Sequence, residues 1–89
     1  MSIRVETRGV EEHQHPFYVI RYAVVRDGEE YITSVARYVH NAQGGKVQFL
    51  EPDMRKIQKL PNAIEHMNEV ERVIKEEAVQ LMEQLKSND

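Results

Sequence analysis

The pattern of hydrophobic and polar positions changes its period once along the 89-residue chain, near Pro52. Before Pro52 apolar and polar residues tend to alternate, as they do in strands that face a core on one side. After Pro52 apolar residues recur about every 3.6 positions, which is typical of an amphipathic helix. We therefore expect one domain over residues 1–89 with an α+β fold, in which a four-stranded antiparallel meander carries a long C-terminal amphipathic helix on one face.

Four segments carry the strand pattern, at about residues 2–8, 17–26, 30–40 and 46–51. The second and third are rich in β-branched and aromatic residues and are separated by Asp27 and Gly28, a dipeptide typical of hairpin turns. Residues 9–16 are polar and predict a connection. Gly44 and Gly45 supply the turn before the fourth strand, because glycine accepts the positive φ that many turns require.

Two helices are expected after the strands. Pro52 suits a first helical turn, which predicts a short helix over about 53–60 that ends before Pro61. A longer helix is predicted over about 62–86, with a stripe of apolar residues that should contact the sheet: Ile64, Met67, Val70, Ile74, Ala78, Leu81, Met82 and Leu85. Glu71 lies near the centre of this stripe, and we expect it to reach the sheet edge in preference to a buried hydroxyl.

The predicted hairpin is apolar on both of its faces, so its register decides which residues share a face. A three-residue loop of Arg26, Asp27 and Gly28 places one set together, namely Tyr18, Ile20, Tyr22, Val24, Ile32, Ser34, Ala36 and Tyr38. The opposite face then holds Phe17, Val19, Arg21, Tyr31, Thr33, Val35 and Arg37. A two-residue turn would exchange these partnerships, and the sequence leaves that alternative open. We prefer the first register because it gathers the polar residues on one face.

A single helix is too narrow to cover this sheet. With side chains a helix is about 10–12 Å across, whereas four strands span about 19 Å, and no element remains for the second face. Apolar residues mixed with arginine are typical of surfaces where proteins meet. We therefore predict a non-enzymatic protein-interaction or regulatory module, acting as a homodimer or by docking on a protein partner, with these binding residues: Phe17, Val19, Arg21, Tyr31, Thr33, Val35 and Arg37. A strongly bent sheet that hides both faces is the alternative.

Nucleic acid is the second, less favoured partner. A net charge of −3 opposes broad neutralisation of phosphates. The alternative function depends on a sheet surface on which bases could stack, formed by Tyr18, Tyr22, Tyr31 and Tyr38. Basic residues could bind the phosphates beside these tyrosines, namely Arg21, Arg26 and Arg37, together with Arg55, Lys56 and Lys59 of the short predicted helix. An enzyme subunit whose site is completed by another chain is a third hypothesis.

Candidate chemistry is sparse in this sequence. The chain has no cysteine, which excludes disulfides and thiolate metal sites, and it has no nucleophile elbow, phosphate-binding glycine loop or zinc-protease motif. We expect no catalysis and no cofactor. His13 and His15 form an H-x-H pair that could share a metal with His40 or Glu12, but a solvated connection is favoured, and we predict no metal site. Without a membrane span or a secretory signal, the expected location is cytoplasmic, with no membrane partner.

Overall fold

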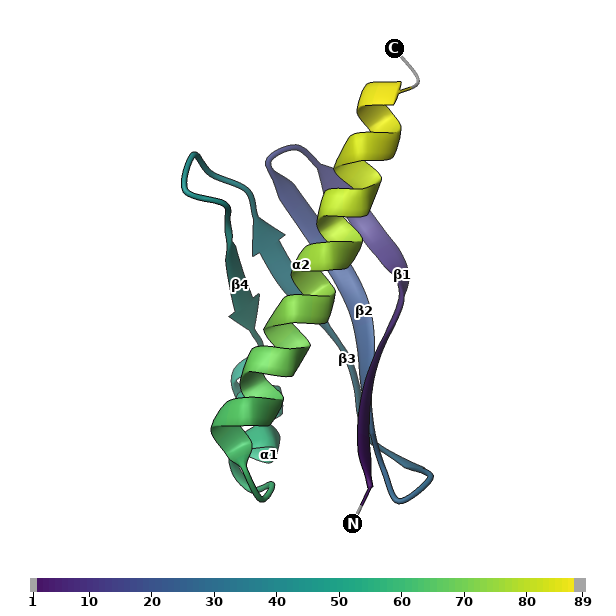
Figure 1. Cartoon of the computed structure of the whole chain (residues 1–89), viewed down its shortest axis with the longest axis vertical. Helices are drawn as coiled ribbons and strands as arrows, with labels where there is room; N and C mark the ends of the chain where they lie inside the picture. Colours follow the sequence, from purple (N-terminus) through teal and green to yellow (C-terminus); the bar gives the residue numbers. More distant parts are fainter. Residues whose placement is uncertain (1, 88–89) are drawn as a thin grey trace.

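The computed structural model describes residues 2–87 and confirms the predicted α+β architecture. Its elements in chain order are β1 (Ile3–Gln14), β2 (Phe17–Arg26), β3 (Glu29–Val39), β4 (Lys46–Phe49), α1 (Glu51–Gln58) and α2 (Ala63–Ser87). The strands form one antiparallel sheet in the order β1-β2-β3-β4, which is a meander. Helix α2 crosses one face of this sheet diagonally, and its C-terminal end extends past the strands (Figure 1).

Strand β1 continues through residues 9–14, where the sequence predicted a connection. Its pairing with β2 shifts between Thr7 and Val10 and again between Val10 and Glu12, so β1 contains two irregularities. Gly9 adopts a φ of 94°, which glycine tolerates without strain. Extra residues of this kind interrupt the alternation of polar and apolar side chains while the strand goes on pairing. That interruption is why the polar segment resembled a connection in the sequence.

The turn between β2 and β3 contains two residues, Asp27 and Gly28, with φ values of 51° and 83°, so the predicted three-residue loop is wrong. The predicted face partnerships are nevertheless confirmed for every residue except Tyr31, because Tyr31 is an extra residue in β3. Val25 pairs with Glu30 and Val24 with Ile32, which leaves Tyr31 without a partner in β2. This bulge shifts the register back, and the buried side of the hairpin then pairs Tyr22 with Ser34, Ile20 with Ala36 and Tyr18 with Tyr38.

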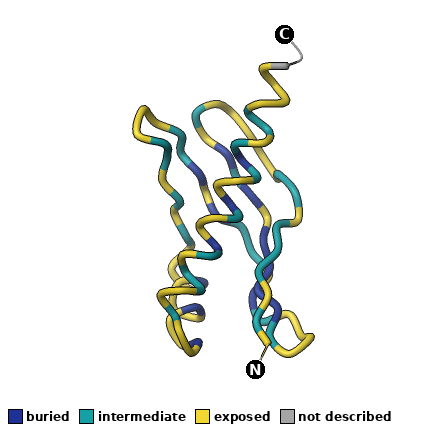
Figure 2. The backbone as a smooth tube through the Cα atoms, in the orientation of Figure 1, coloured by how far each residue is buried: buried dark blue, intermediate teal, exposed yellow. Residues whose placement is uncertain are grey.

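The core lies between α2, α1 and one face of the sheet. Figure 2 shows the buried positions on the central strands and on the sides of the helices that face them. The fully buried side chains of this core include Tyr18, Ile20, Tyr22, Val24, Ile32 and Tyr38 from the sheet, Ile57 from α1, and Val70, Ile74 and Ala78 from α2. The centre of the predicted helix stripe therefore makes the contacts.

Both ends of that stripe lie outside the core. Ile64 is 78% exposed and Leu85 is 41% exposed, contrary to the prediction that they contact the sheet. A helix of 25 residues is about 37 Å long, and its diagonal path carries both ends past the width of the sheet. Glu71 is exposed, as expected, and lines a groove beside Lys46 of β4.

Candidate functional site

Six of the predicted binding residues lie together on the sheet face opposite α2. Strands β2 and β3 position them, because Val19 pairs with Arg37, Arg21 with Val35, and Ala23 with Thr33. We call this surface the open face; it comprises Phe17, Val19, Arg21, Thr33, Val35 and Arg37. Phe17 remains 44% exposed, and no helix in residues 2–87 crosses this face.

Tyr31, the seventh predicted binding residue, does not belong to the open face. It is the extra residue of the β3 bulge, and its ring packs against the edge of the core. Its hydroxyl donates a hydrogen bond to the carbonyl oxygen of Lys56 in α1, at 2.9 Å. The Arg26 guanidinium and the Lys56 ammonium lie 5.9 and 6.0 Å from the centre of its ring. The bulge therefore directs this side chain toward α1.

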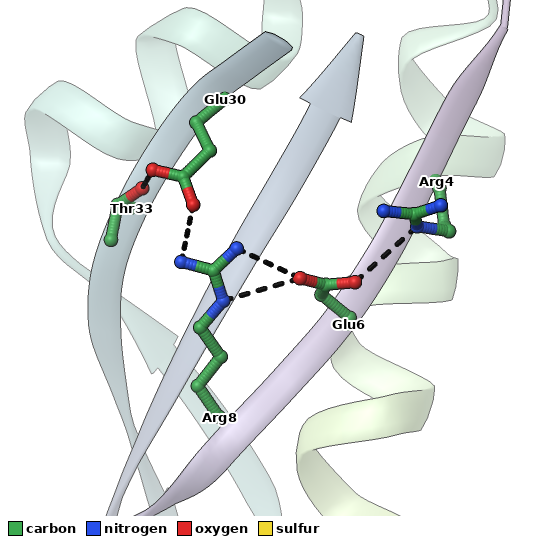
Figure 3. A network of polar contacts seen from close by, with 5 residues as sticks. All are labelled: Arg4, Glu6, Arg8, Glu30 and Thr33. Atoms are coloured by element: carbon green, nitrogen blue, oxygen red, sulfur yellow. Dashed lines mark hydrogen bonds and ion pairs between the residues drawn. The ribbon is translucent and has the colours of Figure 1, made fainter. Parts of the chain in front are cut away.

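In the half of this sheet face near the β2–β3 turn, charged side chains form ion pairs with one another and cover the strands. Arg8 forms ion pairs with Glu6, at 2.8 Å, and with Glu30, and Glu6 also contacts Arg4 at 3.3 Å (Figure 3). Thr33 donates a hydrogen bond to Glu30 at 3.0 Å, which closes the network. Hydrogen bonds from Arg8 lower the pKa of both the Glu6 and the Glu30 carboxyl groups.

Two apolar residues of β2 lie between the strands that carry this network. Ala23 pairs with Glu6 on one side and Thr33 on the other, while Val25 lies between Arg4 and Glu30. Both are buried although no helix within residues 2–87 covers them. The long side chains of the charged residues exclude water with their aliphatic parts while their charged groups remain hydrated. This half of the face thus has satisfied charges and little exposed apolar surface.

The other half of the face is different, because its apolar and charged groups lack such partners. The Arg37 guanidinium lies 5.3 Å from the centre of the Phe17 ring, which is a cation–π contact. Among residues 2–87, neither Arg37 nor Glu12 makes an ion pair within the chain. Val19 is half-buried between them, and Val35 is half-buried beside Arg21. This arrangement can bind a surface with apolar groups and charges of both signs.

Sequence reasoning missed the contribution of β1 to this surface. Glu12 pairs with Val19, so its side chain lies on the same side of the sheet as the open face. The Arg21 guanidinium reaches over Gly9, where an added β-carbon would lie 3.6 Å from Nη2. The signal was present in Arg4, Glu6 and Arg8, whose alternation marks an exposed strand face, but the irregularities after Thr7 concealed its continuation.

The tyrosines required for a base-stacking surface are not available on the sheet. Tyr18, Tyr22 and Tyr38 are each at most 1% exposed, on the face covered by α2. Tyr31 is engaged with α1, so Phe17 is the aromatic residue that the open face presents. Base stacking needs accessible aromatic rings, and this surface does not provide the predicted set.

The H-x-H pair does not gather a metal-ligand set. His15 approaches His40, with ring centres 5.9 Å apart, but each Nδ1 is occupied by a tyrosine hydroxyl. His15 Nδ1 lies 2.7 Å from Tyr18 Oη, and His40 Nδ1 lies 3.1 Å from Tyr38 Oη. Among the described residues, no group of three or more histidine, aspartate or glutamate side chains is arranged to hold a metal ion.

These contacts instead hold side chains of the two turns together at one end of the sheet. The Tyr38 hydroxyl donates to the carbonyl oxygen of Gly44, so it accepts its second hydrogen bond from His40. Burial raises the pKa of both the Tyr18 and Tyr38 hydroxyls. The sequence does not predict the contact between His15 and His40, because it depends on the meander, which places two turns at the same end of the sheet.

A second polar pair, Asp53 and Tyr22, is buried where α1 meets the sheet. Asp53 of α1 is 9% exposed and lies near the buried hydroxyl of Tyr22. Burial raises the pKa of Tyr22, and the negative charge of Asp53 acts in the same direction. Neither Tyr22 Oη nor Asp53 Oδ2 makes a hydrogen bond of regular geometry within residues 2–87. The pair therefore belongs to the interior of the fold and is separate from the open face.

No protein-family model matches this chain, and no curated protein or solved structure shows significant similarity to it. Within the described part of the chain, no helix has the length and hydropathy needed to cross a membrane. Inference about function therefore depends on the surface described above.

Proposed function

We propose that this protein is a non-enzymatic interaction or regulatory module that binds protein through its open face. One observation carries the proposal: strand β2 has a fully buried side under α2 and an uncovered side on which Phe17 is 44% exposed beside Arg37. Exposed aromatic and arginine side chains are enriched where proteins bind one another, whereas contiguous apolar surface is limited on monomeric proteins.

The two halves of the uncovered face support this function in different ways. The half with Arg8 has its charges paired within the chain, so it suits the hydrated rim of an interface. The half with Phe17, Val19 and Arg37 combines apolar contacts with an unpaired guanidinium, which suits the interface centre. A protein surface can satisfy both halves at once.

The test compares neighbouring substitutions on the two sides of the molecule. Val19→Glu should abolish association while the protein stays folded, because the new carboxylate is hydrated in the free chain and is buried only on binding. Met54→Glu is the matched control, since Met54 is an exposed apolar residue of α1 away from this face. Association is measured by analytical ultracentrifugation and by recovery of bound protein from the native cell, and folding by circular dichroism.

Loss of association in Val19→Glu alone supports the proposal. If Val19→Glu associates as the wild type does, the open face is not the binding surface. If it unfolds while Met54→Glu stays folded, Val19 belongs to the core, and the proposal is also wrong.

A further inference from the structure

The charges that flank β2 on the uncovered face follow a regular arrangement. In one transverse row, Glu12 of β1, Val19 of β2 and Arg37 of β3 lie side by side. In another row, Arg4 of β1, Val25 of β2 and Glu30 of β3 lie side by side. In both rows β1 and β3 carry opposite charges on either side of an apolar residue, and the sign reverses from one row to the other.

Resting on the proposed function, we infer that the partner of this face is a second copy of the same chain, related by a two-fold axis parallel to β2. A rotation about that axis lays β1 of one copy over β3 of the other and keeps each row in place. Glu12 then faces Arg37 of the second copy, and Arg4 faces Glu30 of the second copy. Each pair occurs twice, because a two-fold interface is reciprocal.

A second two-fold arrangement of two such faces would also bring opposite charges together. A two-fold axis perpendicular to the strands and passing near Tyr22 would lay each strand over itself in the opposite direction. Because Val19 and Val25 are equally distant from Tyr22 along β2, Glu12 would then lie over Arg4 of the second copy. The two arrangements differ in the partner of Glu12, and only the axis along β2 places Glu12 against Arg37, which the experiment below tests.

The area of the face suits a dimer of modest affinity. Four strands at about 4.8 Å spacing and ten residues of β2 at about 3.3 Å give roughly 600 Å² per copy in flat projection, or about 1,200 Å² in total. That is near the lower limit for a specific protein interface. We therefore expect a dissociation constant in the micromolar range. The sheets would pack with their strands nearly aligned, as in other face-to-face sheet pairs.

Two cations among residues 2–87, Arg8 and Arg21, lie close to the proposed axis. Arg8 bridges Glu6 of β1 and Glu30 of β3 above β2, so its charge is paired within the chain, whereas Arg21 makes no such pair within the described residues. The Arg21 guanidinium reaches sideways over Gly9 of β1. The two Arg21 charges are thus displaced from the axis in opposite directions, toward β1 of each copy. This placement leaves the centre of the interface to Val19 and Phe17.

The test is a charge exchange between Glu12 and Arg37, neither of which has an ion-pair partner among residues 2–87. Glu12→Arg alone places two arginines against each other in every pair, and Arg37→Glu alone places two glutamates together. Each single variant should dimerise about a hundredfold more weakly than the wild type. A 1:1 mixture of the two variants should form a heterodimer, because each then supplies the charge that the other lacks. Native mass spectrometry separates the species by mass.

Matched controls carry the same charge changes away from this face. Glu65→Arg and Lys59→Glu alter exposed residues near the ends of α2 and α1 and should dimerise as the wild type does. The double variant Glu12→Arg/Arg37→Glu should also recover the wild-type dissociation constant. Recovery in the mixture shows in addition that both single variants are folded.

Each of the following results would overturn the inference. If both single variants dimerise as the wild type does, or if mixing them restores nothing, the proposed pairs do not form. If the wild type stays monomeric at high micromolar concentration while Val19→Glu still loses a different bound protein, the second copy is the wrong partner and the proposed function stands. If Val19→Glu has no effect on any association, the proposed function fails together with the dimer.

Discussion

The two sides of β2 show how one strand can serve two purposes. Ile20 and Tyr22 are fully buried beneath α2, whereas their neighbours Val19 and Arg21 lie on the uncovered side. Both sides carry apolar residues, so apolar content does not distinguish the core from the surface. What distinguishes them is the presence of a second layer, since α2 and α1 cover one side and charged side chains cover part of the other. The exposed apolar face next to a complete core is the feature on which we base the proposal of binding.

The largest expected effect concerns the covered side, through α2. Ile74→Asp should unfold the protein, because burial of an unpaired carboxylate costs several kcal/mol, comparable with the total stability of about 5–10 kcal/mol for so small a domain. Ile64→Asp is the control, since Ile64 is 78% exposed on the same helix. Thermal unfolding followed by circular dichroism measures both. An Ile74→Asp protein that melts like the wild type would show that α2 packs in another phase.

Truncation of two adjacent side chains compares the sides of β2 directly. Ile20→Ala should lower the free energy of unfolding by about 2–5 kcal/mol, because it leaves a cavity in the core. Val19→Ala should change it by less than about 1 kcal/mol when measured at a concentration where the chain is monomeric. Urea unfolding of each variant gives the values. Equal losses at both positions would mean that the open face is covered within the monomer.

Alkaline pH should destabilise the fold through Tyr22, which lies on the covered side of the sheet. Burial, followed by the charge of Asp53, raises the pKa of Tyr22 in the folded state above the value of about 10 in the unfolded chain. The stability that this proton supports is fully present below about pH 10 and is lost as the pH rises. Tyr22→Phe should therefore reduce the fall of melting temperature above pH 10. A smaller fall of melting temperature should remain in Tyr22→Phe, because burial also raises the pKa values of Tyr18 and Tyr38.

Melting curves between pH 8 and pH 11 provide this comparison. A Tyr31→Phe variant is the control, because Tyr31 lies outside the core and its hydroxyl contacts a backbone carbonyl. An unchanged alkaline fall in Tyr22→Phe would exclude Tyr22 as its cause.

Acid pH should destabilise the fold through the ion pairs on the uncovered side. This is the smallest of the expected effects. Arg8 lowers the pKa of Glu6 and Glu30, so their contribution to stability is present above the unfolded pKa of about 4.3 and is lost as the pH falls below it. Arg8→Gln should flatten the acid part of the melting profile and change the melting temperature at pH 7 only slightly, because solvent screens exposed ion pairs. Arg37→Gln is the control, and a similar change in both variants would contradict the assignment to this network.

Much of the architecture was predictable from local patterns. The period of two before Pro52, the glycine turns and the helical stripe after Pro61 identified the sheet and both helices. Six of the seven predicted surface residues proved to lie together, because alternation along β2 and β3 determines which side chains share a face. Tyr31 was misplaced because a bulge adds one residue and breaks that alternation.

Outside residues 9–14, the sequence by itself determined where the chain is extended, about where it turns and which helix positions are apolar, since these properties follow from spacing over a few residues. Tertiary structure decided the rest: the bulges in β1 and β3, the contact between His15 and His40, and the placement of Glu12 and Arg37 on either side of Val19. Each depends on which residues of neighbouring strands pair with one another. A bulge is stable only when the pairing and packing on both sides of it compensate for the lost ladder contact, and that balance involves residues far apart in the chain.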